Sequence, residues 1–172
     1  MLNKILVTID ESGSSEWAFD TALAMAKSLQ AELHLVHVLD PFASGSPKHP
    51  LTSVDSFSKV VETSKEETYE QEWDQFESEF GALLKQKQAE AEAAGVTATY
   101  SQAKGEPERK ICEVARINNI DLIVTGNRDR TNPSSISTYL VRHAPCSVTV
   151  VHPKAHNRVI SSESRQMAAA VQ

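Results

Sequence analysis

Residues 4–9 have the sequence KILVTI, a nearly continuous run of β-branched and aliphatic side chains, and residues 121–125, DLIVT, repeat the pattern late in the chain. A strand with apolar side chains on both faces is covered on both faces, so these two runs predict strands of a parallel sheet with helices on each side. Weaker or alternating runs at 32–38, 97–101 and 147–151 predict three further strands.

The residues between the first two predicted strands have helical spacing. Ala18, Ala22 and Ala26 recur at four-residue intervals, which puts small side chains on one face and allows close approach to a sheet. Met25 and Leu29 are expected to fill the remaining space beside them. Because helices alternate with strands in this way, the sequence predicts βαβ units with right-handed crossovers.

The segment before the third strand is expected to hold the longest helix. Two overlapping capping-box patterns, at 63–66 and 64–67, mark its start, and Gly95 marks its end. The preceding residues 41–62 are rich in Ser, Pro and Lys and predict an exposed inserted loop. We interpret the stripe of large side chains on this helix as covering the sheet, with an enlarged subunit interface as the alternative. The stripe consists of Tyr69, Trp73, Phe76, Phe80, Leu83 and Leu84.

Two shorter helices complete the pattern. The first is expected from Pro107 to about Asn119, and the second follows Asn132 as a cap and Pro133 as its opening residue. We therefore predict a single α/β domain over residues 1–153, followed by a flexible C-terminal tail at 154–172.

Composition excludes several classes of protein. The chain has 172 residues, with 17 Lys and Arg against 23 Asp and Glu, a net charge of −6. This charge excludes a strongly basic nucleic-acid binder, and two cysteines are too few for a disulfide scaffold. The sequence has no apolar stretch of roughly 18 residues that could cross a membrane. The apolar run after its first residues is short for a signal peptide, so none is expected. We expect a cytoplasmic protein that binds neither nucleic acid nor membrane.

Polar residues follow three of the predicted strands. In an open α/β sheet, ligands bind beyond the carboxyl ends of the strands where the strand order reverses. Residues 10–13 (DESG), 38–40 (VLD) and 126–130 (GNRDR) occupy such ends, and 134–137 (SSIS) open the next helix. A carboxylate here could bind a ribose, and hydroxyls and free amides at a helix start could bind phosphate. The alternative is that these residues serve only the turns.

Four motifs carry a family resemblance. They are ILVTIDES at 5–12, GEP at 105–107, DLIVTGNR at 121–128 and SISTYLVRHAPCSV at 135–148. In this order they resemble the universal stress protein family, over roughly residues 3–153. The resemblance implies a doubly wound five-stranded sheet of order 3-2-1-4-5 with helices on both faces, and a cytoplasmic protein of the stress response.

The resemblance also implies a homodimer through the last strand, Ser147–Val151, with higher oligomers open. A physical argument points the same way. This strand is apolar, β-branched and late in the chain, so we expect it at a sheet edge, where an unpaired strand tends to associate with another. Pairing with its own copy across a two-fold axis covers the edge.

Many members of the family bind ATP or another adenine nucleotide, and the resemblance implies a set of site residues. Asp10 matches the acidic residue after the first strand, and Val38 matches the position whose backbone meets adenine. Gly126 matches the first glycine of the pattern G-x2-G-x9-G-[ST]. The phosphate side of the expected site also includes Arg128, Ser134, Ser135, Ile136 and Ser137.

The phosphate-binding pattern is incomplete in this chain. Asp129 stands where the second glycine belongs, and Ser134 stands for the third glycine only eight positions after Gly126, where the pattern requires 13. Glycine permits close approach of a backbone to phosphate, whereas an aspartate adds negative charge. We therefore expect a site that retains its base-and-ribose half and has a weakened triphosphate half.

These observations favour a stress-response protein that binds an adenine nucleotide, AMP-like or ATP, weakly or conditionally as a signal. The alternative is a nucleotide-free dimeric scaffold that acts through protein partners. Enzymatic activity is not expected, because no nucleophile with its base can be assembled and no lysine follows the glycines as in a P-loop. No metal is predicted. His34 and His37 lie three residues apart on a strand and therefore face opposite sides.

Overall fold

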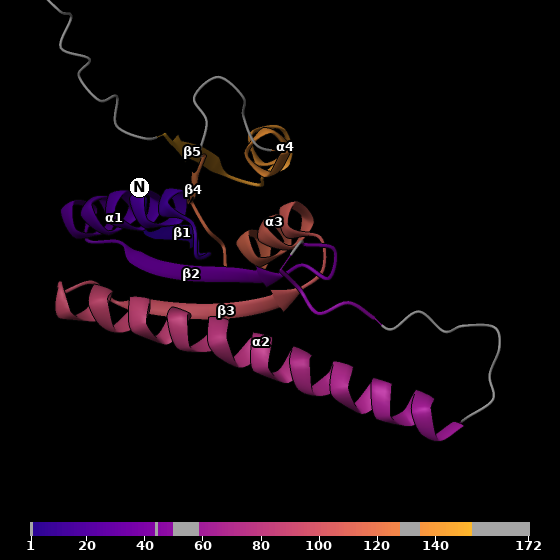
Figure 1. Cartoon of the computed structure of the whole chain (residues 1–172). Coiled ribbons are helices and arrows are strands. Elements are labelled where there is room, and N and C mark those ends of the chain that lie inside the picture. Colours follow the sequence, from indigo (N-terminus) through magenta and orange to yellow (C-terminus); the bar gives the residue numbers. More distant parts are fainter. Residues whose placement is uncertain (1, 44, 50–58, 128–134, 153–172) are drawn as a thin grey trace, which may run out of the picture.

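The computed structural model describes residues 2–43, 45–49, 59–127 and 135–152, with the backbone alone for residues 59–65 and 135. Five parallel strands form one sheet in the order β3-β2-β1-β4-β5 (Figure 1). The predicted fold class and strand order are confirmed. In chain order the elements are β1 (Lys4–Thr8), α1 (Gly13–Leu29), β2 (Glu32–Leu39), α2 (Lys59–Ala93), β3 (Ala98–Lys104), α3 (Pro107–Ile117), β4 (Leu122–Gly126), α4 (Ser135–His143) and β5 (Ser147–Val151).

The central strand β1 is buried on both faces. Ile5 and Val7 enter the core beneath α1 and α2, whereas Leu6 enters the core beneath α3 and α4, and none of the three is exposed. Alternate side chains of a strand point to opposite faces, so a strand between two helical layers must be apolar at every position. The composition of residues 4–9 therefore follows from the position of β1 in the sheet.

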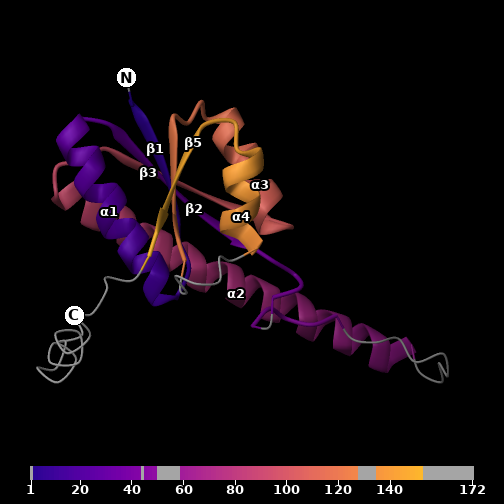
Figure 2. The same cartoon turned by 90° about the horizontal axis from the view of Figure 1, so that it is seen from above.

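Helix α1 packs on the sheet through its alanines. Ala18, Ala22 and Ala26 are fully buried, as their spacing predicts, and Figure 2 shows α1 on one side of the sheet with α3 and α4 on the other. The expectation for Leu29 was wrong, because this last residue of the helix is 43% exposed. Phe19, which lies on the same face one residue after Ala18, fills the core instead.

Helix α2 is longer than expected. It begins at Lys59, four residues inside the segment 41–62 that was expected to be loop, and before the capping-box residues at 63–67. It ends at Ala93, and Gly95 follows with φ +83°, which confirms the predicted stop. The N-terminal part of α2 extends past the carboxyl end of β3 (Figure 1).

The remaining boundaries differ by a few residues from the sequence prediction. Strand β3 continues to Lys104 rather than ending at 101, and α3 ends at Ile117. Asn132, Pro133 and the predicted tail at 154–172 lie outside the described residues. Among the helices that the structure describes, none combines the length and the apolar character needed to span a membrane.

Candidate functional site

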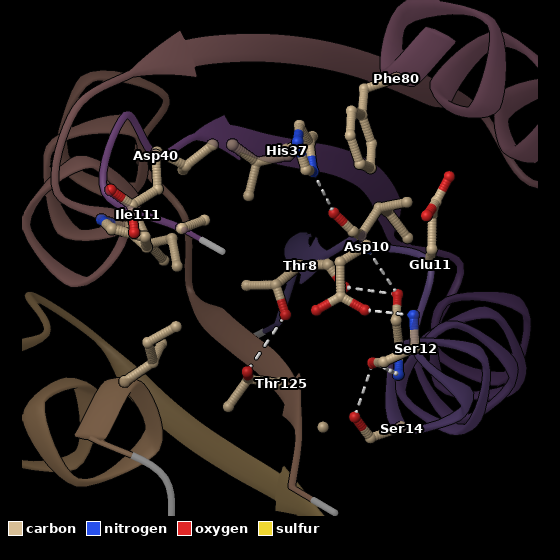
Figure 3. A pocket seen from close by; sticks show the side chains of 18 of the residues that line it. Thr8, Asp10, Glu11, Ser12, Ser14, His37, Asp40, Phe80, Ile111 and Thr125 are labelled. Atoms are coloured by element: carbon tan, nitrogen blue, oxygen red, sulfur yellow. Dashed lines mark hydrogen bonds between the residues drawn. The ribbon is translucent and has the colours of Figure 1, made fainter. Parts of the chain in front are cut away.

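A cavity of about 860 Å³ opens at the carboxyl ends of β1, β2 and β4 (Figure 3). Strand β1 has β2 on one side and β4 on the other, so the strand order reverses at this point. Ligands of open α/β sheets bind in this crevice, and the volume is in the ordinary range for small-molecule sites, roughly 300–1,000 Å³. The turn before α1 and residues of α2, α3 and α4 complete the walls.

The turn between β1 and α1 is held by its own side chains. Ser15 Oγ accepts a hydrogen bond from the Asp10 N–H (2.9 Å) and donates one to the Thr8 carbonyl (3.3 Å). The Asp10 carboxylate accepts the Ser12 N–H through Oδ1 (2.6 Å), and Ser12 caps α1 by accepting the Ser15 N–H (3.2 Å). Asp10 therefore shapes the turn while Ser12 is the cap, and the exposed carboxylate keeps its second oxygen for the cavity.

Strand β2 places a buried histidine beside this turn. His37 is only 7% exposed, and its Nδ1 lies 2.7 Å from the Ile9 carbonyl oxygen, so Nδ1 carries the proton and donates it. The ring stacks on Phe80 with centroids 3.7 Å apart and planes within 5°. Burial lowers the pKa of His37, against the opposing effects of the Ile9 carbonyl and the nearby carboxylates of Asp10 and Glu11. The ring is therefore neutral at pH 7.

The end of β4 forms the floor of the cavity. Thr8 Oγ1 donates to Thr125 Oγ1 across the β1–β4 pair (3.1 Å). Gly126 lies against the first turn of α1, where a Cβ atom would come within 2.1 Å of the Ser14 carbonyl oxygen. Gly126 is thus needed for close packing, whatever its role toward a ligand.

Helix α2 contributes a wall that the sequence interpretation missed. Phe76, Glu79 and Phe80 line the cavity, whereas the aromatic stripe was interpreted as covering the sheet, with an enlarged subunit interface as the alternative. Ring contacts continue along the helix, from Phe80 to Phe76 at 5.0 Å and from Phe76 to Trp73 at 5.6 Å between centroids. The helix of a βαβ crossover starts near the carboxyl edge of the sheet, where the cavity lies. This property of the crossover could have predicted from the sequence that α2 borders the site.

The described lining of the cavity is acidic. It includes four carboxylates and no lysine or arginine. Two like charges about 4 Å apart repel by roughly 1 kcal/mol in water and by about 4 kcal/mol at an effective dielectric constant near 20. This lining therefore disfavours a highly charged anion more than a neutral or singly phosphorylated ligand. The four residues are Asp10, Glu11, Asp40 and Glu79.

The structure brings four of the predicted site residues together. Asp10, Val38, Gly126 and Ile136 line the cavity. Ser137 is 2% exposed and lines a smaller cavity of about 330 Å³ beside β5. Two further members of the expected set, Arg128 and Ser134, and the substituted position Asp129, lie outside the described residues, and of Ser135 only the backbone is described, as the first residue of α4.

Metal ligands do not gather in the described part of the chain. No group of three or more His, Cys, Asp or Glu side chains there could hold a metal ion. His34 bonds to the hydroxyls of Thr99 and Ser101, on the opposite face of β2 from His37.

The five parallel strands with a cavity at the point of strand reversal define a doubly wound α/β protein with a small-molecule crevice. The universal stress protein family model matches residues 1–152. The chain belongs to the universal stress protein family. It is 31% identical over 154 residues to a putative universal stress protein of Staphylococcus haemolyticus, covering 86% of this chain and 82% of that one.

Solved structures agree with this assignment. The universal stress protein UspA from Lactobacillus plantarum superposes with a TM-score of 0.64 at 25% identity, over 87% of this chain and 97% of that one. A universal stress protein in complex with cAMP has a TM-score of 0.60 at 19% identity, over 88% and 97% of the two chains. An Arabidopsis thaliana family member with AMP bound has a TM-score of 0.59 at 18% identity, over 94% and 99%. The last two likenesses establish a shared fold.

Proposed function

We propose that this universal stress protein binds an adenine nucleotide weakly or conditionally, as a signal, and that it binds AMP more readily than ATP. The observation that carries the proposal is the cavity at the strand-reversal point. Asp10 and Val38 lie on its walls, and its described lining includes no lysine or arginine side chain. Two proteins of the same fold hold cAMP and AMP. We further propose a cytoplasmic location and no catalytic turnover.

The proposed ligand contacts follow from the two strand ends. The second carboxylate oxygen of Asp10 is suited to accept hydrogen bonds from ribose hydroxyls, which are donors. The backbone at Val38 is suited to meet the edge of the base, and Thr8 and Thr125 form the floor between them. The carboxylates along the wall then act against each added phosphate, so ATP binds less tightly than AMP.

Isothermal titration of the full-length protein with adenosine, AMP, cAMP and ATP tests the proposal, together with the variant Asp10→Asn. Asparagine keeps an oxygen for the Ser12 N–H but replaces the second acceptor by an amide donor. We expect about a tenfold or greater loss of AMP affinity, since a hydrogen bond to a charged group contributes about 1.5–3 kcal/mol. Asp20→Asn, on the exposed side of α1, is the matched control and should bind as the wild type.

Two outcomes would contradict this function. ATP that binds more tightly than AMP would show that the polyphosphate half is intact. Absence of binding by every ligand tested would favour the alternative, a nucleotide-free dimeric scaffold that acts through protein partners. Adenine nucleotide retained through purification, detected by mass spectrometry, would support the binding function independently.

We also propose that the protein is a homodimer paired through β5. Strand β5 lies at one end of the sheet order, next to β4 alone among the described strands. Its side chains at 148–151 are half-buried although they belong to an apolar strand, which leaves surface for a second copy to cover.

A further inference from the structure

His37 joins three parts of the cavity wall. It belongs to β2, its Nδ1–H donates to the carbonyl of Ile9, the residue directly after β1, and its ring stacks on Phe80 of α2 (Figure 3). The side chain is more than nine-tenths buried, and both it and Phe80 line the cavity. Few rotamers are open to a ring held on one edge and one face, so its donor is fixed in direction.

The Ile9 carbonyl needs this donor. The Ile9 N–H makes the last bond from β1 to β2, to the Val36 carbonyl at 2.8 Å, and beyond it the chain leaves the sheet. Ile9 is 3% exposed, and a buried carbonyl without a partner is costly. The same peptide unit continues into the Asp10 N–H, which donates to Ser15 Oγ. His37 and Ser15 therefore hold the two ends of one peptide plane.

We propose that His37 is a positioning residue of the nucleotide site: by holding the Ile9–Asp10 peptide it fixes the direction in which the Asp10 carboxylate enters the cavity. The inference rests on the proposed function for its effect on binding, because it matters to a ligand only if Asp10 contacts one. A histidine that only filled space in the core would not need a donor at Nδ1 directed at the Ile9 carbonyl, and neither would a histidine exposed to solvent.

The other ring nitrogen agrees with a fixed neutral tautomer. Nε2 is buried and has no hydrogen-bond partner among the described residues. With the proton on Nδ1, an unprotonated Nε2 leaves only a lone pair unused. A second proton, on Nε2, would make the ring cationic and place an unpaired charged donor in the core. The doubly protonated ring is therefore disfavoured, and His37 stays in the neutral form that donates from Nδ1 alone.

Two variants separate the hydrogen bond from the ring. His37→Asn keeps a donor, because the Asn amide nitrogen is as many bonds from Cβ as histidine Nδ1, but it removes the ring. His37→Phe keeps a ring for the stack on Phe80 and removes the donor. We expect about a tenfold or greater loss of adenosine affinity in His37→Phe and rescue to within about threefold in His37→Asn, measured by titration calorimetry. His34→Asn, on the same strand but facing away, is the matched control.

If the wild type binds no nucleotide, that result overturns the proposed function but not the role of His37 in holding the Ile9–Asp10 peptide. A measurement on the free protein tests that role separately. In the free protein we expect imidazole ¹⁵N shifts of the Nδ1–H tautomer. The Ile9 carbonyl ¹³C and Asp10 amide ¹⁵N shifts should change in His37→Phe and be retained in His37→Asn. An Nε2–H tautomer, or equal losses in both variants, would overturn the positioning role.

Discussion

Gly126 ends β4 against the first turn of α1, and its missing side chain lets the two segments meet. A Cβ atom at this position would lie 2.1 Å from the Ser14 carbonyl oxygen and 2.9 Å from the Ser14 Cβ. Both are far inside normal contact, and the nearest atoms belong to backbone rather than to a flexible side chain. The glycine that begins the nucleotide-binding pattern therefore also has a packing role.

Gly126→Ala should destabilise the protein by about 1–3 kcal/mol, because α1 must shift to relieve the overlap. Urea unfolding followed by circular dichroism measures the change. Gly13→Ala is the matched control, since a Cβ atom there meets nothing within 4 Å. As the first residue of α1, position 13 should tolerate alanine with a gain of up to about 1 kcal/mol. Equal effects of the two substitutions would contradict the packing role.

Among the elements, α2 is tied to the rest of the fold by a charged residue as well as by apolar packing. Lys87 Nζ lies 2.8 Å from a Glu16 carboxylate oxygen on α1 and 2.9 Å from one on Glu90, over the ring of Phe19. These two carboxylates raise the pKa of Lys87 in spite of its burial, which acts to lower it. The contact joins the two helices on one face of the sheet.

The backbone N–H and C=O groups of β5 point alternately toward β4 and toward the open edge of the sheet. The Val151 carbonyl accepts the Asn127 N–H at 2.8 Å and therefore points toward β4. Backbone groups of successive residues in a strand point to alternate sides, so the Val150 N–H points outward, to the open edge. A substitution at 150 can thus remove an edge donor without breaking the β4–β5 ladder.

Val150→Pro should leave the fold intact and convert the proposed dimer to monomers or aggregates, because proline is tolerated only where the N–H faces away from a ladder. Light scattering after size-exclusion chromatography measures the oligomeric state. Val150→Thr keeps the N–H and should remain dimeric. A dimer unchanged by proline would show that this edge is not the interface.

For the molecule as a whole, acid stability follows from groups whose pKa is shifted on folding. Burial lowers the pKa of His34 and of His37 below the ordinary 6.5. The unfolded chain therefore binds more protons below that pH, and stability declines as the pH falls. The pKa of Asp121 is lowered from about 3.8 by the N–H groups of Asn3 and Lys4, which adds a second loss at lower pH.

Between pH 6.5 and the lowered pKa of His37 in the folded protein, the free energy of unfolding should fall by up to about 1.4 kcal/mol for each pH unit of acidification. Urea titrations from about pH 7.5 to pH 4.5 measure this slope. His37→Asn should reduce this slope and leave the contribution of His34, whereas Asp121→Asn should leave the slope unchanged and act only at lower pH. An equal slope in wild type and His37→Asn would contradict the role of this ring.

Much of the fold could be predicted from the sequence because its strongest signals are local. The run at 4–9 has apolar side chains on both faces, and the alanines of α1 lie on one stripe. Leu29 was placed wrongly because periodicity cannot show where a helix passes beyond the sheet. The start of α2 was misplaced because capping-box letters also occur inside helices.

The candidate site was predictable only where it follows strand ends. Asp10 and Val38 were predicted because carboxyl ends of parallel strands share one edge. The bond from His37 to the Ile9 carbonyl depends on the register of β1 against β2, which spacing within one strand does not reveal. Phe76 and Phe80 reach the cavity because of where α2 crosses the sheet, a property set by distant packing.

The chain of ring contacts along α2 gives the protein an optical reporter of its own. It has two tryptophans, of which Trp17 is 38% exposed, whereas Trp73 is 6% exposed beneath the Lys104 ammonium group and meets Phe76 edge-on. A molecule that enters the cavity and presses on Phe76 changes the surroundings of the Trp73 indole. Occupancy can therefore be followed by intrinsic fluorescence in unlabelled protein, with Trp17→Phe to remove the background emission.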